Sequence, residues 1–541
     1  MKKILFYICV LLHVIVLSAQ AQGQISRPKL VVGIVVDQMR WDYLYKYYEK
    51  YGENGLKRMM REGFNCQNAM INYLPSFTGP GHATIYTGSV PAIHGIAAND
   101  WVDKNTGKFV YCAEDKTVHT VGGSGKAGRM SPANMYTTTI TDELKIATQG
   151  KAKVFGIGIK DRGSILPAGH SADGAFWFDD STGNFITSSF YMQQLPAWLI
   201  KFNNRRWADT FMNSSWELLY PINAYTNSTA DNTDWEGKLP GETAPVFPHK
   251  TPAYKNKGYY GIRYMPAGNT ITFKAAKACI KGEQLGADNI TDFLCVTFST
   301  PDYAGHNYGP DAIEMEDMYL RWDNELASFL AYLDKNIGKG EYTVFLTADH
   351  GAAHNAGYMK SLNIPAGSET QAEATGRLNE HLKEKTGRDS LILALYNYQV
   401  YFNEKSIAGT DKEELKQLVT DWLYKQDGVA YVVDMQDMDD AVIPEPVKTM
   451  IVNGYNRERS GSLQIVMKPG WYSGHGKTGT THGSWNPYDT HIPLLWYGAG
   501  IKRGETHRTV NMIDIAPTLA ALLYIQMPNG CIGQVITELV D

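Results

Sequence analysis

Short apolar runs alternate along the chain with stretches in which apolar residues recur at helical spacing. The runs are rich in β-branched and aromatic residues, which is typical of strands buried on both faces. Helical spacing extends from Trp41 to about Glu62, where Gly63 should end the helix, and recurs over 313–333 and 513–523. The alternation predicts an α/β fold with a doubly wound, mostly parallel sheet. The expected strands cover residues 30–36, 154–159, 293–298, 344–348 and 492–497.

Charged residues follow four of these runs directly. The first run ends in Asp37, and the third leads through a short turn to Asp302. The second leads into Lys160-Asp161-Arg162, and the fourth into Asp349-His350-Gly351. Because open α/β sheets bind ligands beyond the carboxyl ends of their strands, we expect these side chains to converge at one edge.

Two long stretches interrupt the pattern, at about 165–290 and 356–480. The first is rich in Trp, Tyr, Asn, Gly and Pro. The second carries a predicted helix over 411–426 and predicted strands near 393–402, 429–433 and 463–468. We interpret both stretches as insertions that shape the rim of the site, and the acidic residues 434–440 as a solvated surface.

The N-terminus has the pattern of a secretory signal peptide. Lys2 and Lys3 precede an apolar run over 4–17, and Ala19-Gln20-Ala21 forms a cleavage site. The run is short for a transmembrane span. We therefore expect residues 1–21 to be removed, leaving a domain over 22–541 that is periplasmic or secreted and has no stable membrane anchor. We also expect this domain to be a monomer.

Charge and cysteine content narrow the function classes. A net charge of -5 without any basic tract argues against a nucleic-acid partner. The cysteines of the expected mature chain lack paired metal-binding spacing, and in an exported protein they could form one or two disulfides. These cysteines are Cys66, Cys112, Cys279, Cys295 and Cys531.

One threonine lies where a helix is predicted to begin. Proline suits the first turn of a helix and glycine suits its end, so Pro80 and Gly88 bracket a helix that starts at about Thr78. Backbone N–H groups and the helix dipole favour an anion at this end. On local evidence alone, a threonine that caps the helix is the favoured interpretation of Thr78.

Carboxylates and histidines cluster in the same strand-end and glycine-rich segments. Carboxylate and imidazole donors without thiolate suit catalytic zinc, and two such ions could activate a nucleophile and stabilise a leaving oxygen. Taken singly, each residue could instead be a turn, cap or surface residue. The candidate ligands are Asp37, Asp302, His306, Asp349, His350 and His482. Most of the other histidines near the motifs are expected to be supporting or structural: His82, His94, His170, His354, His475 and His491.

These motifs together resemble the alkaline phosphatase superfamily, and within it the PafA-type phosphate-irrepressible alkaline phosphatases, which are related to the type I phosphodiesterase/nucleotide pyrophosphatase family. The likeness covers essentially the whole mature chain in the expected order. It is carried by the Thr78 segment, Ala98-Asn99-Asp100-Trp101, Lys160-Asp161-Arg162-Gly163, Thr300-Pro301-Asp302 with His306, Thr347-Ala348-Asp349-His350-Gly351 and Thr481-His482-Gly483.

The resemblance implies a di-zinc phosphomonoesterase. Thr78 would be the nucleophile, would form a phospho-threonine and would contact one zinc. That zinc would be held by Asp37, Asp349 and His350. The other zinc would be held by Asp302, His306 and His482. Asn99, Lys160 and Arg162 would bind the phosphoryl oxygens of small-molecule phosphate monoesters, with Asp161 orienting Arg162.

Two alternatives stay open. Diesterases of the superfamily keep the asparagine but are expected to lack the Lys-x-Arg pair, so a phosphodiesterase or nucleotide pyrophosphatase is the alternative within enzymes. A catalytically silent zinc-binding protein is the alternative outside them. A sulfatase is disfavoured because no C/S-x-P-x-R motif surrounds Thr78.

Overall fold

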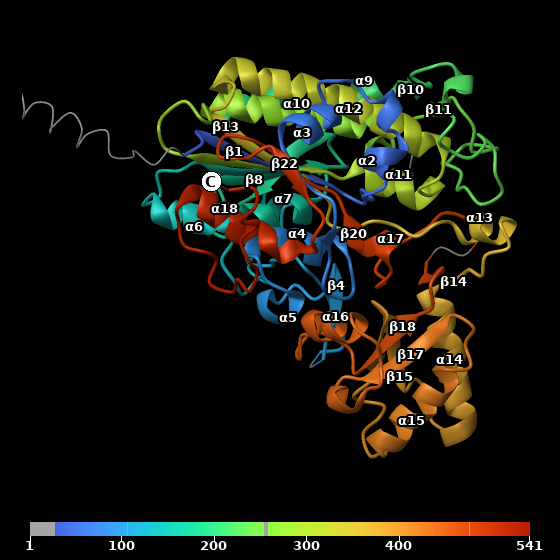
Figure 1. Ribbon diagram of the computed structural model, residues 1–541. Coiled ribbons are helices and arrows are strands. Elements are labelled where there is room, and N and C mark those ends of the chain that lie inside the picture. Colours follow the sequence, from blue (N-terminus) through green and yellow to red (C-terminus); the bar gives the residue numbers. More distant parts are fainter. Residues whose placement is uncertain (1–26, 105, 254–257, 475–476, 541) are drawn as a thin grey trace, which may run out of the picture.

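A central sheet dominates the computed structural model, which describes residues 27–104, 106–253, 258–474 and 477–540. Within these ranges ten strands form the sheet in the order β22-β2-β21-β13-β1-β12-β7-β8-β9-β6. The five strands from β13 to β8 are mutually parallel, while β21 and β9 run antiparallel at their two sides. The predicted α/β class and mostly parallel sheet are therefore confirmed (Figure 1).

The predicted apolar runs form the middle of this sheet. Leu30 in β1 lies opposite Asp292 in β12 and Tyr342 in β13, so the carboxyl ends of these strands finish side by side. In sheet order the strands are β22 (Gly504–Thr506), β2 (Phe64–Cys66), β21 (Leu494–Gly498), β13 (Tyr342–Thr347), β1 (Leu30–Val36), β12 (Asp292–Phe298), β7 (Val154–Gly158), β8 (Gly174–Asp179), β9 (Asn184–Ser188) and β6 (Thr120–Val121).

Helices cover both faces of the sheet (Figure 1). On one face lie α3 (Leu56–Glu62), α10 (Pro266–Glu283) and α12 (Ile313–Leu333). On the other lie α4 (Thr78–Thr87), α6 (Ile140–Ala147), α7 (Asp161–Ala168) and α18 (Ile515–Leu523). Burial on both faces explains why the strands of the parallel part are almost continuously apolar.

The helix predicted from Trp41 to Glu62 is wrong as a single element. The segment forms α2 (Tyr43–Lys46), a short 3-10 turn and then α3. Asp323 of α12 explains the break, because its carboxylate accepts hydrogen bonds from the backbone N–H groups of Gly52 and Leu56, at 2.8 and 2.7 Å. Asp323, which is distant in sequence, thus keeps this loop out of the helical conformation, although the spacing of apolar residues predicted a continuous helix.

The stretch 165–290 differs from a simple insertion. Its first part supplies the end of α7 and strands β8 and β9, which continue the central sheet. Only the part after β9 leaves the sheet, in the short helices α8 (Ala197–Asn203) and α9 (Trp207–Met212) and the β10–β11 pair (Ser215–Trp216 and His249–Lys250), before α10 returns to it.

Residues 367–473 form a separate lobe, drawn in orange in Figure 1. It has its own four-stranded sheet, in the order β15-β16-β18-β17, and its own apolar core. The predicted strand near 393–402 is a hairpin whose turn residues Asn397 and Tyr398 both have positive φ, as a tight type I′ turn requires. The lobe elements are β14 (Gly367–Glu369), α14 (Gln371–Thr386), β15 (Ile392–Tyr396), β16 (Gln399–Phe402), α15 (Lys412–Leu423), β17 (Val429–Asp434), α16 (Val447–Gly454), β18 (Leu463–Met467) and β19 (Trp471–Ser473).

Several further elements are short. They are β3 (Ala69–Met70), α5 (Pro91–His94), β4 (Asp100–Asp103), β5 (Lys108–Tyr111), the 3-10 turn η3 (Tyr260–Tyr264), α11 (Thr300–Tyr308), α13 (Ala356–Ser361), α17 (Pro487–Thr490), β20 (His491–Ile492) and β23 (Val510–Asn511).

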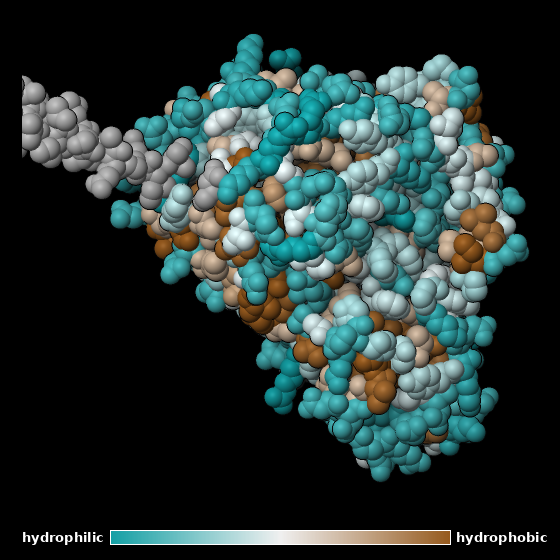
Figure 2. All heavy atoms as spheres, viewed as in Figure 1, coloured by the Kyte–Doolittle hydropathy of each residue, from teal (hydrophilic) through white to brown (hydrophobic). Residues whose placement is uncertain are grey.

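The membrane anchor, the disulfides and the signal peptide are the expectations that remain. No helix of the described ranges combines the length and apolarity that a membrane span needs. Apolar residues occur only in small groups on the face seen in Figure 2. The five cysteines from Cys66 onward are free thiols. The predicted signal peptide lies outside the described residues.

Gly33 lets α4 pack tightly on the sheet. A Cβ atom at this position of β1 would lie 2.4 Å from Tyr86 Oη of α4 and 2.6 Å from Phe345 Cζ of β13. Tyr86 and Phe345 are fully buried, so neither ring can move aside freely. The glycine that interrupts the first apolar run therefore sets how closely the Thr78 helix approaches the sheet.

We expect Gly33→Ala to lower the free energy of unfolding by about 1–3 kcal/mol, because the added methyl group overpacks the core. Gly376→Ala in α14 is the control, since a Cβ there meets nothing within 4 Å and alanine favours a helix by up to about 1 kcal/mol. Denaturant unfolding of both variants tests this. Equal stability of the two would contradict the packing argument.

Candidate active site

Three aspartates meet at the carboxyl edge of the central strands. Asp37 follows β1 directly, Asp349 follows β13, and Asp302 lies in the first turn of α11, after β12. The backbone N–H of Asp37 donates to Phe298 O at 3.0 Å, which joins the ends of β1 and β12. All three side chains are buried. The predicted convergence of strand-end acids is therefore what the fold produces.

Burial and mutual repulsion perturb these carboxyl groups. Burial, and next the charge of Asp302, raise the pKa of Asp37 to about 6. Burial and the charge of Asp37 raise the pKa of Asp349 well above its ordinary value. For Asp302 burial acts in the same sense, but Lys160, His306 and His482 together outweigh it and lower the pKa well below the ordinary value. The positive charge of Lys160 therefore does not balance the negative charge of the three carboxylates.

Three histidines surround the carboxylates with a shared orientation. The Nδ1 atoms of His306, His350 and His482 lie 2.8, 2.9 and 2.8 Å from the backbone oxygens of Thr480, Gly351 and Ser76. An Nδ1–H donated to a carbonyl leaves Nε2 with a free lone pair in the neutral ring, which is the usual way to orient a metal-binding imidazole.

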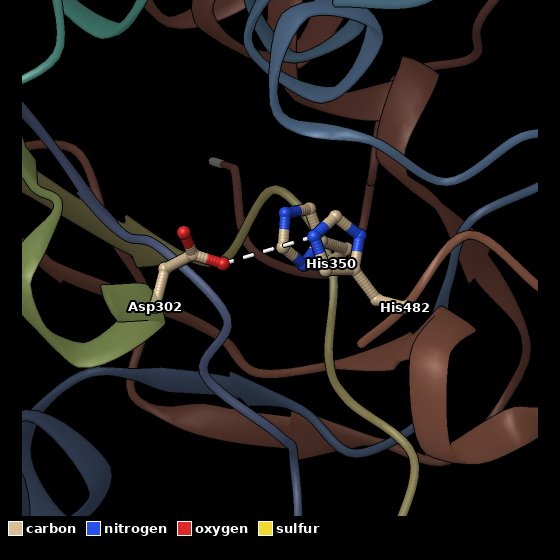
Figure 3. Close-up of side chains that lie close together, drawn as sticks. All are labelled: Asp302, His350 and His482. Atoms are coloured by element: carbon tan, nitrogen blue, oxygen red, sulfur yellow. Dashed lines mark ion pairs between the residues drawn. The ribbon is translucent and has the colours of Figure 1, made fainter. Parts of the chain in front are cut away.

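The Nε2 atoms point toward the carboxylates. His306 Nε2 lies 3.1 Å and His482 Nε2 lies 3.7 Å from Asp302 Oδ1. His350 Nε2 lies 3.5 Å from both Asp37 Oδ1 and Asp349 Oδ2. The rings of His350 and His482 stack with centroids 3.4 Å apart, and Figure 3 shows them overlapping opposite Asp302.

Burial also favours the neutral form of two of these rings. It lowers the pKa of His482 to about 3, with His306 adding to the effect. Burial likewise lowers the pKa of His350 well below its ordinary value. For His306 the attraction of Asp302 outweighs burial and raises the pKa. Neutral imidazole is the form that binds a metal.

The donor set fits a two-metal site. Asp37, Asp349 and His350 offer ligand atoms within 4.8 Å of one another, and so do Asp302, His350 and His482. Asp37 Oδ1 and Asp349 Oδ2 are buried and accept no hydrogen bond from any described residue. Buried carboxylate oxygens without donors are costly unless a cation binds them. The close groups share His350, whereas the resemblance assigned His306 to the second group.

Thr78 occupies the first position of α4, as predicted, with Gly88 in left-handed conformation after the helix. Its Oγ1 lies 3.4 Å from His350 Nε2 and 3.4 Å from Lys160 Nζ. Gly81, one turn later, packs on the backbone of Asp349, and a Cβ there would lie 2.6 Å from Asp349 O. The hydroxyl thus lies beside the first group of candidate ligands, which is where an activated nucleophile would be needed.

Asn99 and Lys160 approach Thr78 from two other elements. Asn99 Oδ1 accepts a hydrogen bond from Gly79 N at 2.7 Å, so the amide lies at the start of α4. Lys160, the residue before α7, is buried, and its Nζ lies 2.7 Å from Asp37 Oδ2 and 2.5 Å from Asp302 Oδ2. Lys160 therefore connects the two groups of candidate ligands as well as the threonine.

Tyr111, which the sequence analysis did not single out, orients Arg162. The Tyr111 hydroxyl accepts a hydrogen bond from Arg162 Nη1 at 3.2 Å and donates to the carboxylate of Asp161. Asp161 thus acts on the Arg162 side chain through Tyr111. Arg162 Nε is buried and donates to no described residue. No local pattern marks Tyr111, because only the packing of the β4–β5 hairpin on α7 brings it here.

Other side chains support the site. Gln38 donates through Nε2 to Asp302 Oδ1 at 2.8 Å, and its adjacency to Asp37 was the available signal. His82 is a supporting residue, as expected: its Nδ1 lies 2.9 Å from Thr78 O and its Nε2 lies 3.1 Å from Thr297 Oγ1. His94, His170, His354 and His491 pair with Thr84, Asp142, Asp311 and Gln67 outside the cluster. His475 lies outside the described residues.

The family model for type I phosphodiesterase/nucleotide pyrophosphatase matches residues 31–489. Alkaline phosphatase PafA from Elizabethkingia meningoseptica is 50% identical over 528 residues, which cover 97% of this chain and 96% of that protein. The chain belongs to the PafA-type alkaline phosphatases. The crystal structure of wild-type PafA has a TM-score of 0.93 at 49% identity and is matched over 96% of this chain and 100% of that one.

A second curated relative agrees with this assignment. Alkaline phosphatase PhoV from Synechococcus elongatus is 49% identical over 526 residues, covering 95% of this chain and 93% of PhoV. The alkaline phosphatase assignment of this PafA-type chain therefore rests on full-length similarity as well as on the buried Asp/His groups.

Removing divalent metal is expected to lower the thermal stability of this PafA-type protein, because three buried carboxylates then repel one another. A metal present at about a thousand times its dissociation constant stabilises the folded state by about 4 kcal/mol. Differential scanning calorimetry of chelated and metal-loaded protein measures the difference in Tm. Asp37→Asn should reduce this difference in Tm between the chelated and the metal-loaded protein.

Asp437→Asn is the matched control. Asp437 belongs to an exposed acidic group with Glu413 and Asp434, in which Lys416 Nζ already lies 3.0 Å from Glu413 and 2.8 Å from Asp434. This variant should keep the metal dependence of the wild type. A Tm that chelation leaves unchanged would contradict the two-metal fit.

Proposed function

We propose that this alkaline phosphatase hydrolyses small-molecule phosphate monoesters through a covalent phospho-threonine at Thr78. The observation that carries the proposal is the position of the Thr78 hydroxyl, at a helix N-terminus and within 3.4 Å of both His350 and Lys160. The threonine oxygen forms a bond to phosphorus while the ester oxygen departs. Water then attacks phosphorus and releases phosphate, which restores the threonine.

Two zinc ions are the cofactors that the donor chemistry favours. Asp37, Asp349 and His350 would hold one, and Asp302, His306 and His482 the other; sharing of His350 is the alternative that the distances leave open. When bound, such ions lower the pKa of a coordinated hydroxyl and stabilise a departing oxygen. The protein's own contribution is to hold the neutral Nε2 atoms and the carboxylates in a dry, fixed arrangement.

Asn99, Lys160 and Arg162 would bind the non-bridging phosphoryl oxygens. The unused buried Nε of Arg162 supports this role, since a buried guanidinium donor without an acceptor suits an anionic ligand. A solved variant of PafA carries replacements of one threonine, one asparagine, one lysine and one arginine, the residue types proposed here. A dianionic monoester, with three free oxygens, would use all three side chains.

The alternatives differ in substrate and in activity. A phosphodiesterase or nucleotide pyrophosphatase would favour esters whose second group takes the space near Lys160 and Arg162. A zinc-binding protein without catalysis would hydrolyse neither. Turnover of an aryl phosphate and of its methyl diester by the metal-loaded enzyme separates these functions. The N-terminal pattern supports a periplasmic or secreted enzyme acting on external esters.

Thr78→Ala should lower kcat on the aryl monoester by at least about a thousandfold, because the variant lacks the attacking oxygen. Thr78→Ser should retain part of the activity. Thr87→Ala serves as the control on the same helix, since its hydroxyl bonds Ala83 O at the far end. Full activity of Thr78→Ala would exclude the covalent route.

Lys160→Ala and Arg162→Ala should each lower monoester kcat/KM by about a hundredfold and diester kcat/KM by less than about tenfold. The diester carries one charge fewer and gains less from these cations. Lys153→Ala at the opposite end of β7, where the side chain bonds Glu283 O, is the control. Equal losses on both substrates would remove the argument for monoester preference.

A further inference from the structure

Tyr303 lies against Lys160 in a way that the proposed chemistry does not yet use. It follows Asp302 directly on α11, and the Lys160 ammonium lies 5.1 Å from the centre of its ring. A cation within about 6 Å of an aromatic face is attracted by the ring quadrupole, more strongly where water is excluded. Lys160 is 3% exposed, so this contact acts in a largely dry environment.

Arg263 of η3 fixes the tyrosine from a distant part of the chain. Its Nη1 donates to Tyr303 Oη at 2.7 Å, and its guanidinium carbon lies 5.3 Å from the centre of the Tyr303 ring. Asp180, which follows β8, accepts from Arg263 Nε and Nη2 at 2.7 and 2.9 Å. This bidentate pair aligns the guanidinium plane and ties Tyr303 to the end of a sheet strand.

Two further tyrosines confine the same ring. Tyr260 and Tyr264, at the two ends of η3, pack edge-on against Tyr303 with centroid distances of 6.1 and 5.6 Å. Arg263 also lies over the Tyr260 ring at 5.3 Å. Tyr303 therefore has little freedom to rotate, and its ring is a fixed surface beside the Lys160 ammonium.

A fixed aromatic surface restricts where the Lys160 ammonium can lie. A lysine ammonium is a point charge on a flexible stem with about 2 kcal/mol of rotamer entropy. Lys160 Nζ lies closer to Asp37 and Asp302, at 2.7 and 2.5 Å, than to Thr78 Oγ1, at 3.4 Å, so binding of a phosphoryl group at Thr78 competes with the two carboxylates for the ammonium. The attraction of the Tyr303 ring acts on the same ammonium but comes from neither carboxylate, so it persists while the ammonium changes partner.

We propose that Tyr303, held by Arg263 and Asp180, is a positioning residue that directs Lys160 to the phosphoryl group and thereby raises the preference for doubly charged monoesters. This inference rests on the proposed monoesterase function. It assigns a role to the stretch 165–290, which supplies Asp180 and Arg263 as supports of the site.

A cavity gives direct access to this network. It has a volume of about 400 Å³ and is lined by Lys160, Arg162, Asp180, Tyr260 and Arg263, among other residues. A small cation can therefore reach the place of the guanidinium if the arginine side chain is shortened. The network can therefore be tested by truncating Arg263 to alanine and adding guanidinium ion to replace the missing side-chain group.

The first test compares kcat/KM on an aryl monoester with that on its methyl diester in the metal-loaded full chain. Tyr303→Leu should lower the monoester-to-diester ratio by about tenfold, because Lys160 loses its aromatic support. Tyr303→Phe keeps the ring and should retain a ratio closer to that of the wild type. An unchanged ratio in Tyr303→Leu overturns the proposal.

The second test uses Arg263→Ala, which does not adjoin a candidate metal ligand in the chain. Its ratio should fall by about threefold, since the ring persists without its clamp. Millimolar guanidinium should restore the ratio, whereas it should not restore that of Tyr303→Leu. Equal losses on both substrates, or failure of guanidinium to restore the ratio, overturn the role of Arg263.

Arg321→Met is the matched control. Arg321 also pairs with a buried aspartate, with Nε 2.6 Å from Asp317, but it lies on α12 away from Lys160. It should keep the wild-type ratio. Metal content is measured for each variant, and if Tyr303→Leu loses metal, Arg263→Ala decides the question. A wild type that does not prefer monoesters refutes the proposed function itself, before any variant is compared.

Discussion

The electrostatic repulsion among Asp37, Asp302 and Asp349 is the constraint on which the site depends. Parallel pairing of β1 with both β12 and β13 brings their carboxyl ends level, and the acids that follow are buried together. Three carboxylates in a dry environment are tolerated only where cations or donors offset them. Lys160 supplies one positive charge, and oxygens of Asp37 and Asp349 stay without hydrogen bonds. The stability of the fold and the affinity for metal are therefore linked.

The groups around Thr78 reach it from independent elements, and each is fixed by a contact distant in sequence. Gly33 sets the approach of α4, and Tyr111 orients Arg162 from the β4–β5 hairpin that follows Asn99. Because such contacts limit the motion of each side chain, the groups that we propose to bind the phosphoryl oxygens are held in position before substrate arrives. A change in a side-chain support such as Tyr111 should therefore affect the orientation of Arg162 more than overall folding.

Local sequence patterns predicted the parts of the fold that local physics determines. Buried apolar runs became the central strands, and the acids after them met because parallel strands share one edge. The break near Gly52 was missed because Asp323, far along the chain, bonds the loop. The supports Tyr111 and Tyr303 were missed for the same reason, since neither lies in a spacing that reports chemistry. The residue pattern supplied the candidate ligands and the resemblance supplied their grouping, but neither indicated the sharing of His350 that the distances leave open.

The positive charge of Lys160 links metal binding to substrate binding. Without metal, Lys160 offsets Asp37 and Asp302, so its charge is used within the protein. Two divalent cations would take over that task, since together with Lys160 and Arg162 they exceed the charge of the three carboxylates. The lysine would then be free to attract substrate, and a dianionic monoester would gain more from the excess than a monoanionic diester. Metal binding and substrate preference are on this view coupled through one ammonium group, and the neighbouring aromatic ring determines where that group goes when the carboxylates release it.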